Sequence, residues 1–270
     1  MKRSIVLSTH AAQFEAVAFK GDFEGNVAKI ADWGYDGVEL AVRDPSLVNA
    51  EEVREMVSSY GLEVPAIGTG QAWGEERLSF TDSDPEVRAA AIERIKSHIP
   101  FADAMDGVII LGLIRGITPE GQSHEQSMAY LIEALQECAD AAPEHVRFAL
   151  EPLNRYETDL IHTVEDGLDL VEKVGAPNFG LLLDTFHMNI EEPSIEESIR
   201  SCGGRIFHFH VADSNRWYPG AGHLDFASIL EVLRSTGYDG YVSGEFIPQP
   251  DGDTAAQKAI DHLQKVWPEA

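Results

Sequence analysis

Cysteine is scarce in this chain, with only Cys138 and Cys202 among 270 residues. Neither has another cysteine or a histidine beside it at metal-ligand spacing, which argues against a disulfide framework and against a zinc knuckle. Both lie in segments with a helical pattern, and so few cysteines fit a reducing compartment. We therefore expect a cytoplasmic protein.

Long apolar runs are also missing. The longest, such as 107-GVIILGLI-114, fall far short of the roughly 20 residues that span a bilayer. The first residues, MKRSIVLST, carry two basic residues and a short apolar run, but neither a longer apolar region nor a small-residue cleavage site follows. This segment predicts a first β-strand, and we expect no association with a membrane.

Basic residues are few as well. Lysine and arginine number 20 against 46 aspartate and glutamate residues, which gives a formal net charge of -26. A negative surplus of this size repels phosphate backbones and anionic lipid surfaces. The sequence therefore argues against a nucleic-acid partner, and we interpret the surplus as a solvated acidic surface.

What the chain does contain is a regular alternation of short apolar runs and amphipathic segments, without a Pro/Ser-rich linker. This alternation is typical of parallel βαβ units. Helical spacing of apolar residues occurs at 51–61, 85–99, 163–175 and 226–237. Strand-like runs lie at 4–9, 37–42, 63–69, 107–113, 146–151, 178–184, 205–211 and 241–245. The pattern predicts an α/β fold in which residues 1–270 form a single (β/α)8 TIM barrel domain.

A doubly wound Rossmann sheet is the alternative to a barrel. It requires a glycine-rich turn directly after the first strand, where this chain has THAAQF instead. The later segment 68-GTGQAWG-74 has the wrong spacing for a dinucleotide fingerprint. We interpret that segment as an ordinary glycine-containing loop.

Four consecutive predicted strands end in a side chain that can bind a metal ion. Active sites of TIM barrels form where the strands end, so these side chains should lie close together. Any one of the acids could simply be bonded to a neighbouring loop, but four in succession favour a metal site. Carboxylates with one imidazole suit an octahedral ion such as Mn²⁺, Mg²⁺ or Co²⁺. The four residues are Glu151, Asp184, His210 and Glu245.

Two further polar residues belong to strands of the predicted barrel. Because side chains alternate along a strand, His208 should face the interior with His210, and Phe207 and Phe209 should face the helices. His208 is interpreted as an interior histidine with a hydrogen-bond partner. Glu39, near the end of the second strand, is open to two interpretations: support of a metal ligand, or a purely structural role.

Several segments resemble the xylose isomerase-like superfamily of sugar isomerases and epimerases, and within it the ketose 3-epimerases of the D-tagatose and D-psicose type. The similarity covers nearly the whole chain and is strongest to the branch described as L-ribulose 3-epimerase or 5-keto-L-gluconate epimerase. The segments that carry it are 41-AVRDPS-46, 66-AIGTGQA-72, 112-GLIRG-116, 151-EPLNRYE-157, 184-DTFHMNIEE-192, 210-HVADSNRWYPGAGHLDF-226 and 244-GEF-246.

The resemblance implies a metal centre, usually with Mn²⁺ or Co²⁺, held by Glu151, Asp184, His210 and Glu245. It also implies that Glu157, His187 and Arg216 bind substrate oxygens near the reacting carbons. Members of this superfamily are often dimers or tetramers, so the resemblance further implies a homo-oligomer.

The reaction implied is epimerisation beside the carbonyl of a ketose or keto-aldonate, through a metal-stabilised enediolate. Inversion requires a proton to leave one face of the carbon and return to the other, which two facing carboxylates can accomplish. Glu151 and Glu245 are the expected pair. Arg43 and Arg115 follow strand ends and could clamp a substrate carboxylate, although a loop salt bridge with a neighbouring acid is the alternative for each.

Other functions remain open at this point. An aldose–ketose or hydroxypyruvate-type isomerase would use the same metal site. A relative of the endonuclease IV type needs three metals and a basic DNA groove, against which the charge argues. A non-catalytic sugar-binding protein would be expected to lose one of the two glutamates, whereas this chain has both.

Overall fold

The eight apolar runs predicted as strands all form parallel strands in the computed structural model, which describes residues 1–10 and 14–267. The strands are short, and most of their residues are buried. They are β1 (Lys2–Ser8), β3 (Gly37–Ala41), β4 (Ala66–Gly68), β5 (Val108–Leu111), β6 (Phe148–Leu150), β7 (Phe179–Asp184), β8 (Ile206–Val211) and β9 (Tyr241–Gly244).

These strands close into a barrel because β1 pairs with β3 on one side and with β9 on the other. One strand escaped the sequence prediction, the two-residue β2 (Phe19–Lys20), which is too short to produce a periodic pattern. It pairs with Leu7 and Ser8 of β1, beyond Ile5, the last residue of β1 that pairs with β9. The predicted TIM barrel is confirmed, with β2 as an addition to its rim.

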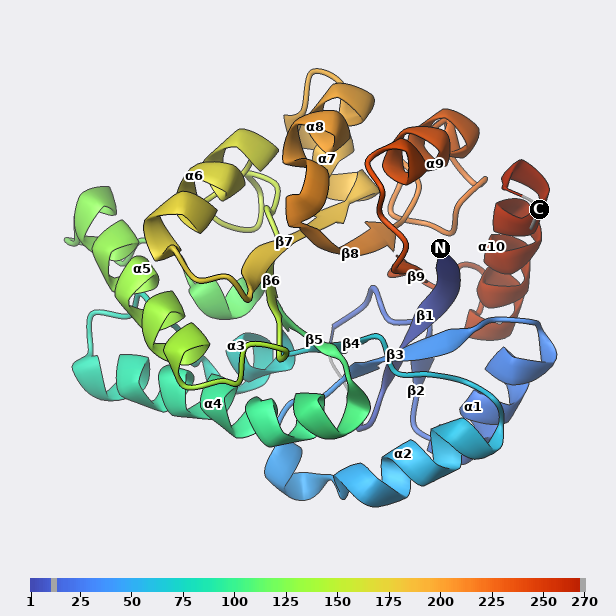
Figure 1. Ribbon diagram of the computed structural model, residues 1–270, viewed down its shortest axis with the longest axis horizontal. Coiled ribbons are helices and arrows are strands. Elements are labelled where there is room, and N and C mark those ends of the chain that lie inside the picture. Colours follow the sequence, from blue (N-terminus) through green and yellow to red (C-terminus); the bar gives the residue numbers. More distant parts are fainter. Residues whose placement is uncertain (11–13, 268–270) are drawn as a thin grey trace.

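Helices form a ring around the strands (Figure 1). The predicted segment 85–99 is too short, because α4 continues through Pro100 to Met105. Proline removes one intrahelical hydrogen bond, while Phe101 and Ala102 are buried beyond it and keep the helix packed. The helices are α1 (Phe23–Asp32), α2 (Ala50–Ser59), α3 (Gln71–Glu76), α4 (Pro85–Met105), α5 (His124–Asp140), α6 (Val164–Val174), α7 (Thr185–Glu191), α8 (Ile195–Cys202), α9 (Phe226–Ser235) and α10 (Gly252–Val266).

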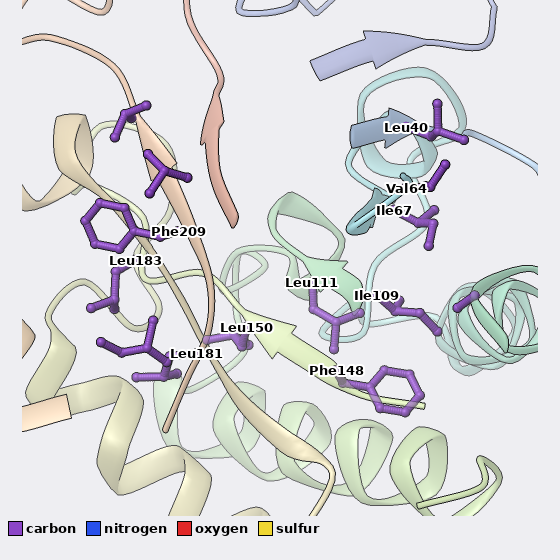
Figure 2. Packing of buried hydrophobic residues seen from close by; sticks show 14 of the residues in the cluster. Leu40, Val64, Ile67, Ile109, Leu111, Phe148, Leu150, Leu181, Leu183 and Phe209 are labelled. Atoms are coloured by element: carbon purple, nitrogen blue, oxygen red, sulfur yellow. The ribbon is translucent and has the colours of Figure 1, made fainter. Parts of the chain in front are cut away.

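Alternation along the strands divides the apolar core into two layers. Figure 2 shows Leu181, Leu183 and Phe209, from the adjacent strands β7 and β8, on the side of the strands that packs against helices. A smaller cluster on the opposite side fills the interior of the barrel; it consists of Ala66, Val108, Ile110, Ala149 and Leu182. The interior is thus packed with side chains, as expected for a TIM barrel.

The side-chain orientation predicted for Phe207 is wrong, whereas that for Phe209 is correct. Phe209 belongs to the helix-facing layer, but Phe207 packs against the interior cluster. The cause is a register shift in the pairing of β7 with β8: Leu181 pairs with Ile206, yet Leu182 pairs with His208. The extra residue of this bulge breaks the strict alternation on which the prediction rested.

No helix in the described part of the chain is both long and apolar enough to cross a bilayer. Both cysteines lie in helices, as predicted: Cys138 in α5 and Cys202 at the end of α8, each buried and with a free thiol.

Candidate metal centre and active site

Four neighbouring strands bring Glu151, Asp184, His210 and Glu245 together. Asp184 ends β7 and pairs in register with His210 of β8, which in turn pairs with Ser243 of β9. Glu151 directly follows β6, and Glu245 directly follows β9. One ligand atom from each of the four side chains lies within 4.8 Å of all the others. The structure thus assembles the predicted set.

The atoms of this cluster fit a divalent cation. Nδ1 of His210 is 3.9 Å from Oε1 of Glu151, 4.0 Å from Oδ2 of Asp184 and 3.7 Å from Oε2 of Glu245. Among the described residues, neither this Nδ1 nor Oε1 of Glu151 has a hydrogen-bond partner, although both atoms are buried. Buried polar atoms are normally hydrogen-bonded, so two unpaired atoms that face the same space indicate that a ligand such as a metal ion belongs between them. Carboxylate oxygens with one imidazole nitrogen are suitable ligands for Mn²⁺, Co²⁺ or Mg²⁺.

The other nitrogen of His210 is occupied by Glu39, which is 1% exposed inside the barrel. Nε2 of His210 lies 2.9 Å from Oε2 of Glu39, and Nε2 of His208 lies 2.8 Å from the same oxygen. Glu39 therefore orients His210 so that its Nδ1 faces the other three ligands. The interpretation of His208 as an interior histidine with a partner agrees with this contact, and of the two interpretations of Glu39 the geometry favours support of a metal ligand.

Burial and charge set the protonation of the metal-free cluster. Burial raises the pKa of Glu245 to about 7, although His210 and Arg216 act in the opposite direction. Burial, together with the charge of Glu245, holds the pKa of Glu151 well above its usual range. Burial alone would lower the pKa of His210, but Glu39 and Glu245 raise it to about 10. In the absence of a cation, the cluster therefore retains protons at neutral pH.

Arg216 closes one side of the cluster. Its Nη2 donates to Oε2 of Glu245 at 2.6 Å and its Nη1 to Oδ2 of Asp184 at 3.3 Å. The guanidinium also lies 4.6 Å from the ring centroid of Phe186. Arg216 has a left-handed backbone conformation, with φ of 64°, in the loop that follows β8. Arg216 is only 8% exposed, so its positive charge is held beside the carboxylates and largely away from solvent.

His187 and Glu157 are positioned by Asn154. The backbone N–H of Asn154 donates to Nδ1 of His187, so in the neutral ring Nε2 carries the proton. Burial, with the nearby charge of Arg216, holds the pKa of His187 well below its usual range, so the ring is neutral. The side-chain amide of Asn154 donates to Oε1 of Glu157 at 2.9 Å. His187 Nε2 lies 3.6 Å from Oε1 of Glu151 and 3.1 Å from Nη1 of Arg216.

Two donors, His187 Nε2–H and the guanidinium of Arg216, therefore face each other next to the predicted metal ligands. An oxygen that accepted a hydrogen bond from both would satisfy them together. The structure thus brings Glu157, His187 and Arg216 to the same cavity as the four predicted ligands.

This cavity has a volume of about 260 Å³. Its lining combines the polar side chains of the predicted ligands with apolar side chains such as Phe14, Val17 and Leu113. Binding sites for small molecules commonly combine apolar walls with a few polar groups at defined positions.

The structure does not bring Arg43 and Arg115 to the cavity. Among the described residues that line it, the only arginine is Arg216. Arg115 is fully buried; its Nε donates to the carbonyl oxygen of Gly112 at 3.0 Å, and its guanidinium also contacts the carbonyl oxygen of Glu151. Its role in the structure is to hold the loop beneath a predicted ligand.

Arg43 forms a salt bridge with neighbouring acids, which is the alternative to a substrate role that the sequence left open. Its Nη1 donates to Oε2 of Glu75 at 2.8 Å, and its Nε lies 3.4 Å from Oε1 of Glu76. The expected carboxylate clamp from these arginines therefore has no support in the geometry.

Gln71 and Glu75 are among the cavity residues that the sequence analysis did not identify. Gln71 and Glu75 line the cavity from α3, within and just beyond the segment 68–74 that was interpreted as a loop. That interpretation is wrong from Gln71 onward. A six-residue helix with a glycine in the middle gives hardly any periodic signal, so only the spacing of four between Gln71 and Glu75 pointed to a shared helix face.

This chain is similar in sequence to a known protein family and to several epimerases. The family model described as xylose isomerase-like TIM barrel matches residues 27–266. The L-ribulose 3-epimerase of Methylomonas sp. (strain DH-1) is 30% identical over 262 residues, covering 93% of this chain and 90% of the relative. The 3-dehydro-D-guloside 4-epimerase of Escherichia coli (strain K12) is 30% identical over 221 residues, covering 79% of this chain and 82% of the relative.

Among solved structures, a D-psicose 3-epimerase with D-tagatose from Clostridium cellulolyticum H10 has a TM-score of 0.83 at 26% identity. The match covers 98% of this chain and 99% of that chain. On the family match and these relatives together, the chain belongs to the xylose isomerase-like TIM barrel family, as the resemblance predicted.

Proposed function

We propose that this protein is a divalent-metal-dependent carbohydrate epimerase that inverts the carbon beside the carbonyl of a ketose. The observation that carries the proposal is the convergence of Glu151 and Glu245 on one cluster from different strands. Both have a raised pKa, as expected for groups that exchange protons near neutral pH. The names of the relatives, a ketose 3-epimerase and a glycoside 4-epimerase, support epimerisation as the reaction class.

The predicted ligands Glu151, Asp184, His210 and Glu245 would hold the metal ion. A divalent ion bound there would act as a Lewis acid that makes the hydrogen beside the carbonyl more acidic. Mn²⁺ is the proposed ion, with Co²⁺ or Mg²⁺ as substitutes, because the donor set combines carboxylate oxygens with one imidazole nitrogen.

The proton transfers fall to the two glutamates. One glutamate, as the ionised carboxylate, takes the proton from the carbon beside the carbonyl. The other, as the protonated carboxylic acid, delivers its proton to the opposite face. Their roles exchange when the other epimer is the substrate. Each glutamate contributes one oxygen to the cluster, which leaves its other oxygen for the proton transfer.

The oxygens of the reacting segment would be bound by the donors described above. His187 Nε2–H and the guanidinium of Arg216 donate to an oxygen that gains negative charge during the reaction. Each such donor typically stabilises the transition state by about 3 kcal/mol in a site from which water is excluded. Glu157, held by Asn154, accepts from a substrate hydroxyl and orients it. Arg43 and Arg115 bond to groups of the protein and are not directed at the cavity, so they do not bind a substrate carboxylate. This favours an uncharged ketose over a keto-aldonate as the substrate.

The protein is further proposed to function in the cytoplasm. Two buried free thiols, Cys138 and Cys202, support a reducing compartment such as the cytoplasm. The partner is a small-molecule keto-sugar.

The test is to incubate the Mn²⁺-loaded protein with a panel of ketoses in D₂O and to follow deuterium position and configuration by NMR. Deuterium at the carbon beside the carbonyl, with inversion, is expected. Deuterium at carbon one with formation of an aldose would instead identify an isomerase. Absence of exchange with every ketose would overturn the proposal in favour of a binding role.

A further inference from the structure

On the side of the cavity away from the metal ligands, the atoms left without partners are acceptors. Gln71, at the start of α3, is 5% exposed and lines the cavity. Its Nε2 donates to Oγ of Ser8 at 2.9 Å, and its Oε1 is buried without a hydrogen-bond partner among the described residues. An unpaired oxygen of this kind in a cavity wall indicates a ligand atom that donates to it.

The neighbouring hydrogen bonds fix which end of the amide is free. Ser8 has one hydroxyl proton, and its Oγ donates that proton to the carbonyl oxygen of His10 at 2.7 Å. Ser8 must therefore accept from Gln71, which places the NH₂ group of the amide toward Ser8. The free atom of Gln71 is thus its oxygen, an acceptor.

A second free acceptor comes from the same helix. Glu75 lies four residues after Gln71, on the same face of α3, and also lines the cavity. Arg43 holds Oε2 of Glu75, while Oε1 is buried and has no partner in the described part of the chain. Arg43 also lies 3.4 Å from Glu76, but Arg94 donates to both oxygens of Glu76, at 3.0 Å and 2.7 Å. Arg43 is therefore mainly the partner of Glu75, and it leaves Oε1 of Glu75 as a free acceptor.

The position of these acceptors identifies which part of a substrate would reach them. In the order of the closed sheet, β4, which precedes α3, is four strands away from β8, which carries His210. The two strands therefore lie on opposite sides of the barrel. Gly112 also lines the cavity, and a Cβ atom there would lie only 3.2 Å from Oε2 of Glu151, so a glycine at this position keeps room beside that carboxylate.

We propose that Gln71 and Glu75 bind the hydroxyl groups on the unreactive end of the substrate, and thereby select an uncharged polyhydroxy ketose over a keto acid. Hydroxyl groups supply the donors that both free oxygens need. A carboxylate has no proton to donate at neutral pH and would be repelled by Glu75. The inference rests on the proposed epimerase function, of which it specifies the substrate class.

The experiment compares three substrates of the Mn²⁺-loaded enzyme: a ketohexose, a ketotetrose that lacks the distal hydroxyls, and a ketohexuronate that carries a carboxylate in place of the terminal hydroxymethyl group. The variants are Gln71→Leu and Glu75→Gln. Glu76→Gln is the matched control, since Glu76 is an acid on the same helix that does not line the cavity. Circular dichroism and thermal unfolding establish that each variant is folded.

For Gln71→Leu, we expect kcat/KM for the ketohexose to fall about tenfold, chiefly through KM, because one hydrogen bond to the substrate is lost. Turnover of the ketotetrose should be nearly unchanged. For Glu75→Gln, the preference of the parent enzyme for the ketohexose over the ketohexuronate should narrow by about tenfold, because removing one charge removes the repulsion. The Glu76→Gln variant should retain the parent selectivity.

Equal losses for ketohexose and ketotetrose in Gln71→Leu, or a parent enzyme that prefers the ketohexuronate, would overturn the inference. Failure of the proposed function is recognised separately, by the lack of turnover of all three substrates. In that case, binding of the same compounds is measured by calorimetry. Tighter binding of the ketohexose, weakened in Gln71→Leu, supports the inference without catalysis, and binding that is indifferent to both variants overturns it.

Discussion

Nε2 of His210 lies 2.9 Å from Oε2 of Glu39, inside the barrel and on the side of the ring away from the predicted metal site. Burial alone would raise the pKa of Glu39, but the two histidines bonded to it hold this pKa well below its usual range. A permanently ionised carboxylate thus fixes the orientation of the histidine that faces Glu151, Asp184 and Glu245. Partners of this kind also make an imidazole a better metal ligand.

Replacement of Glu39 by Gln should weaken metal binding without removing a ligand. We expect the Mn²⁺ dissociation constant to rise about 10- to 100-fold, as is typical for the loss of a partner behind a metal-bound histidine. Calorimetric titration of the metal-free protein measures this change directly. Glu63→Gln, which alters a surface carboxylate bonded to Lys2, serves as the control and should bind Mn²⁺ as the parent does. An unchanged affinity in Glu39→Gln would show that Glu39 has only a structural role.

The barrel itself could be predicted from the sequence because each of its eight main strands contains an apolar run and several of the helices between them have apolar residues at helical spacing. The metal cluster could be predicted for a related reason. In parallel strands, residues at the strand ends meet at one edge of the barrel, so Asp184 and His210 were expected to be neighbours although 26 positions separate them in the chain.

Features that depend on a local irregularity or on packing could not be predicted. The bulge that turns Phe207 inward involves a shift between two strands, which leaves no trace in either strand alone. The substrate role considered for Arg115 rested on its position after a strand, but the direction of its guanidinium depends on the carbonyl groups of the loop near Leu160. Gln71 and Glu75 were missed because α3 is short and contains a glycine.

Replacement of Glu245 by Gln should abolish epimerisation, since the amide cannot take up or deliver a proton. We expect turnover to fall by about 10²- to 10⁴-fold, the usual contribution of a general acid or base. The variant should still fold and should bind Mn²⁺ more weakly. With Glu151 intact, one epimer should continue to exchange its hydrogen for deuterium without inversion. Both quantities are measured by NMR in D₂O, and full epimerisation by the variant would refute the two-carboxylate scheme.

Replacement of Arg115 by Met should impair stability rather than substrate choice. The buried guanidinium donates to several loop carbonyls, including those of Gly112 and Ile161, and its removal leaves these acceptors unpaired. We expect the free energy of unfolding to fall by about 3 kcal/mol, as the loss of several buried hydrogen bonds implies. Turnover of ketoses and of keto acids should decline by the same factor. Chemical denaturation and kinetics check the two expectations.

The exposed Arg54 provides the control for Arg115, because Arg54→Met should change stability by no more than about 0.5 kcal/mol. A selective loss of keto-acid turnover in Arg115→Met would restore the carboxylate clamp that the sequence had suggested.

Metal binding should depend on pH, because the metal-free cluster holds protons that a cation must displace. The pKa of Glu245 is raised to about 7 and that of His210 to about 10, so at pH 6 both groups are largely protonated. A metal ligand must be deprotonated, and each proton that has to be released weakens the apparent affinity. From pH 6 to pH 8, His210 releases a proton for each ion bound, and Glu245 releases part of another near pH 6. The Mn²⁺ affinity should therefore increase by more than about 100-fold over this range.

Calorimetric titration of the metal-free protein with Mn²⁺ in two buffers of different ionisation enthalpy measures this linkage. More than one proton should be released per ion at pH 6 and fewer at pH 8, where His210 still contributes one. The parent and Glu63→Gln should behave alike, since Glu63 lies outside the cluster. If the affinity is the same at both pH values and no protons are released, the cation does not bind among these carboxylates, and the metal centre must lie elsewhere.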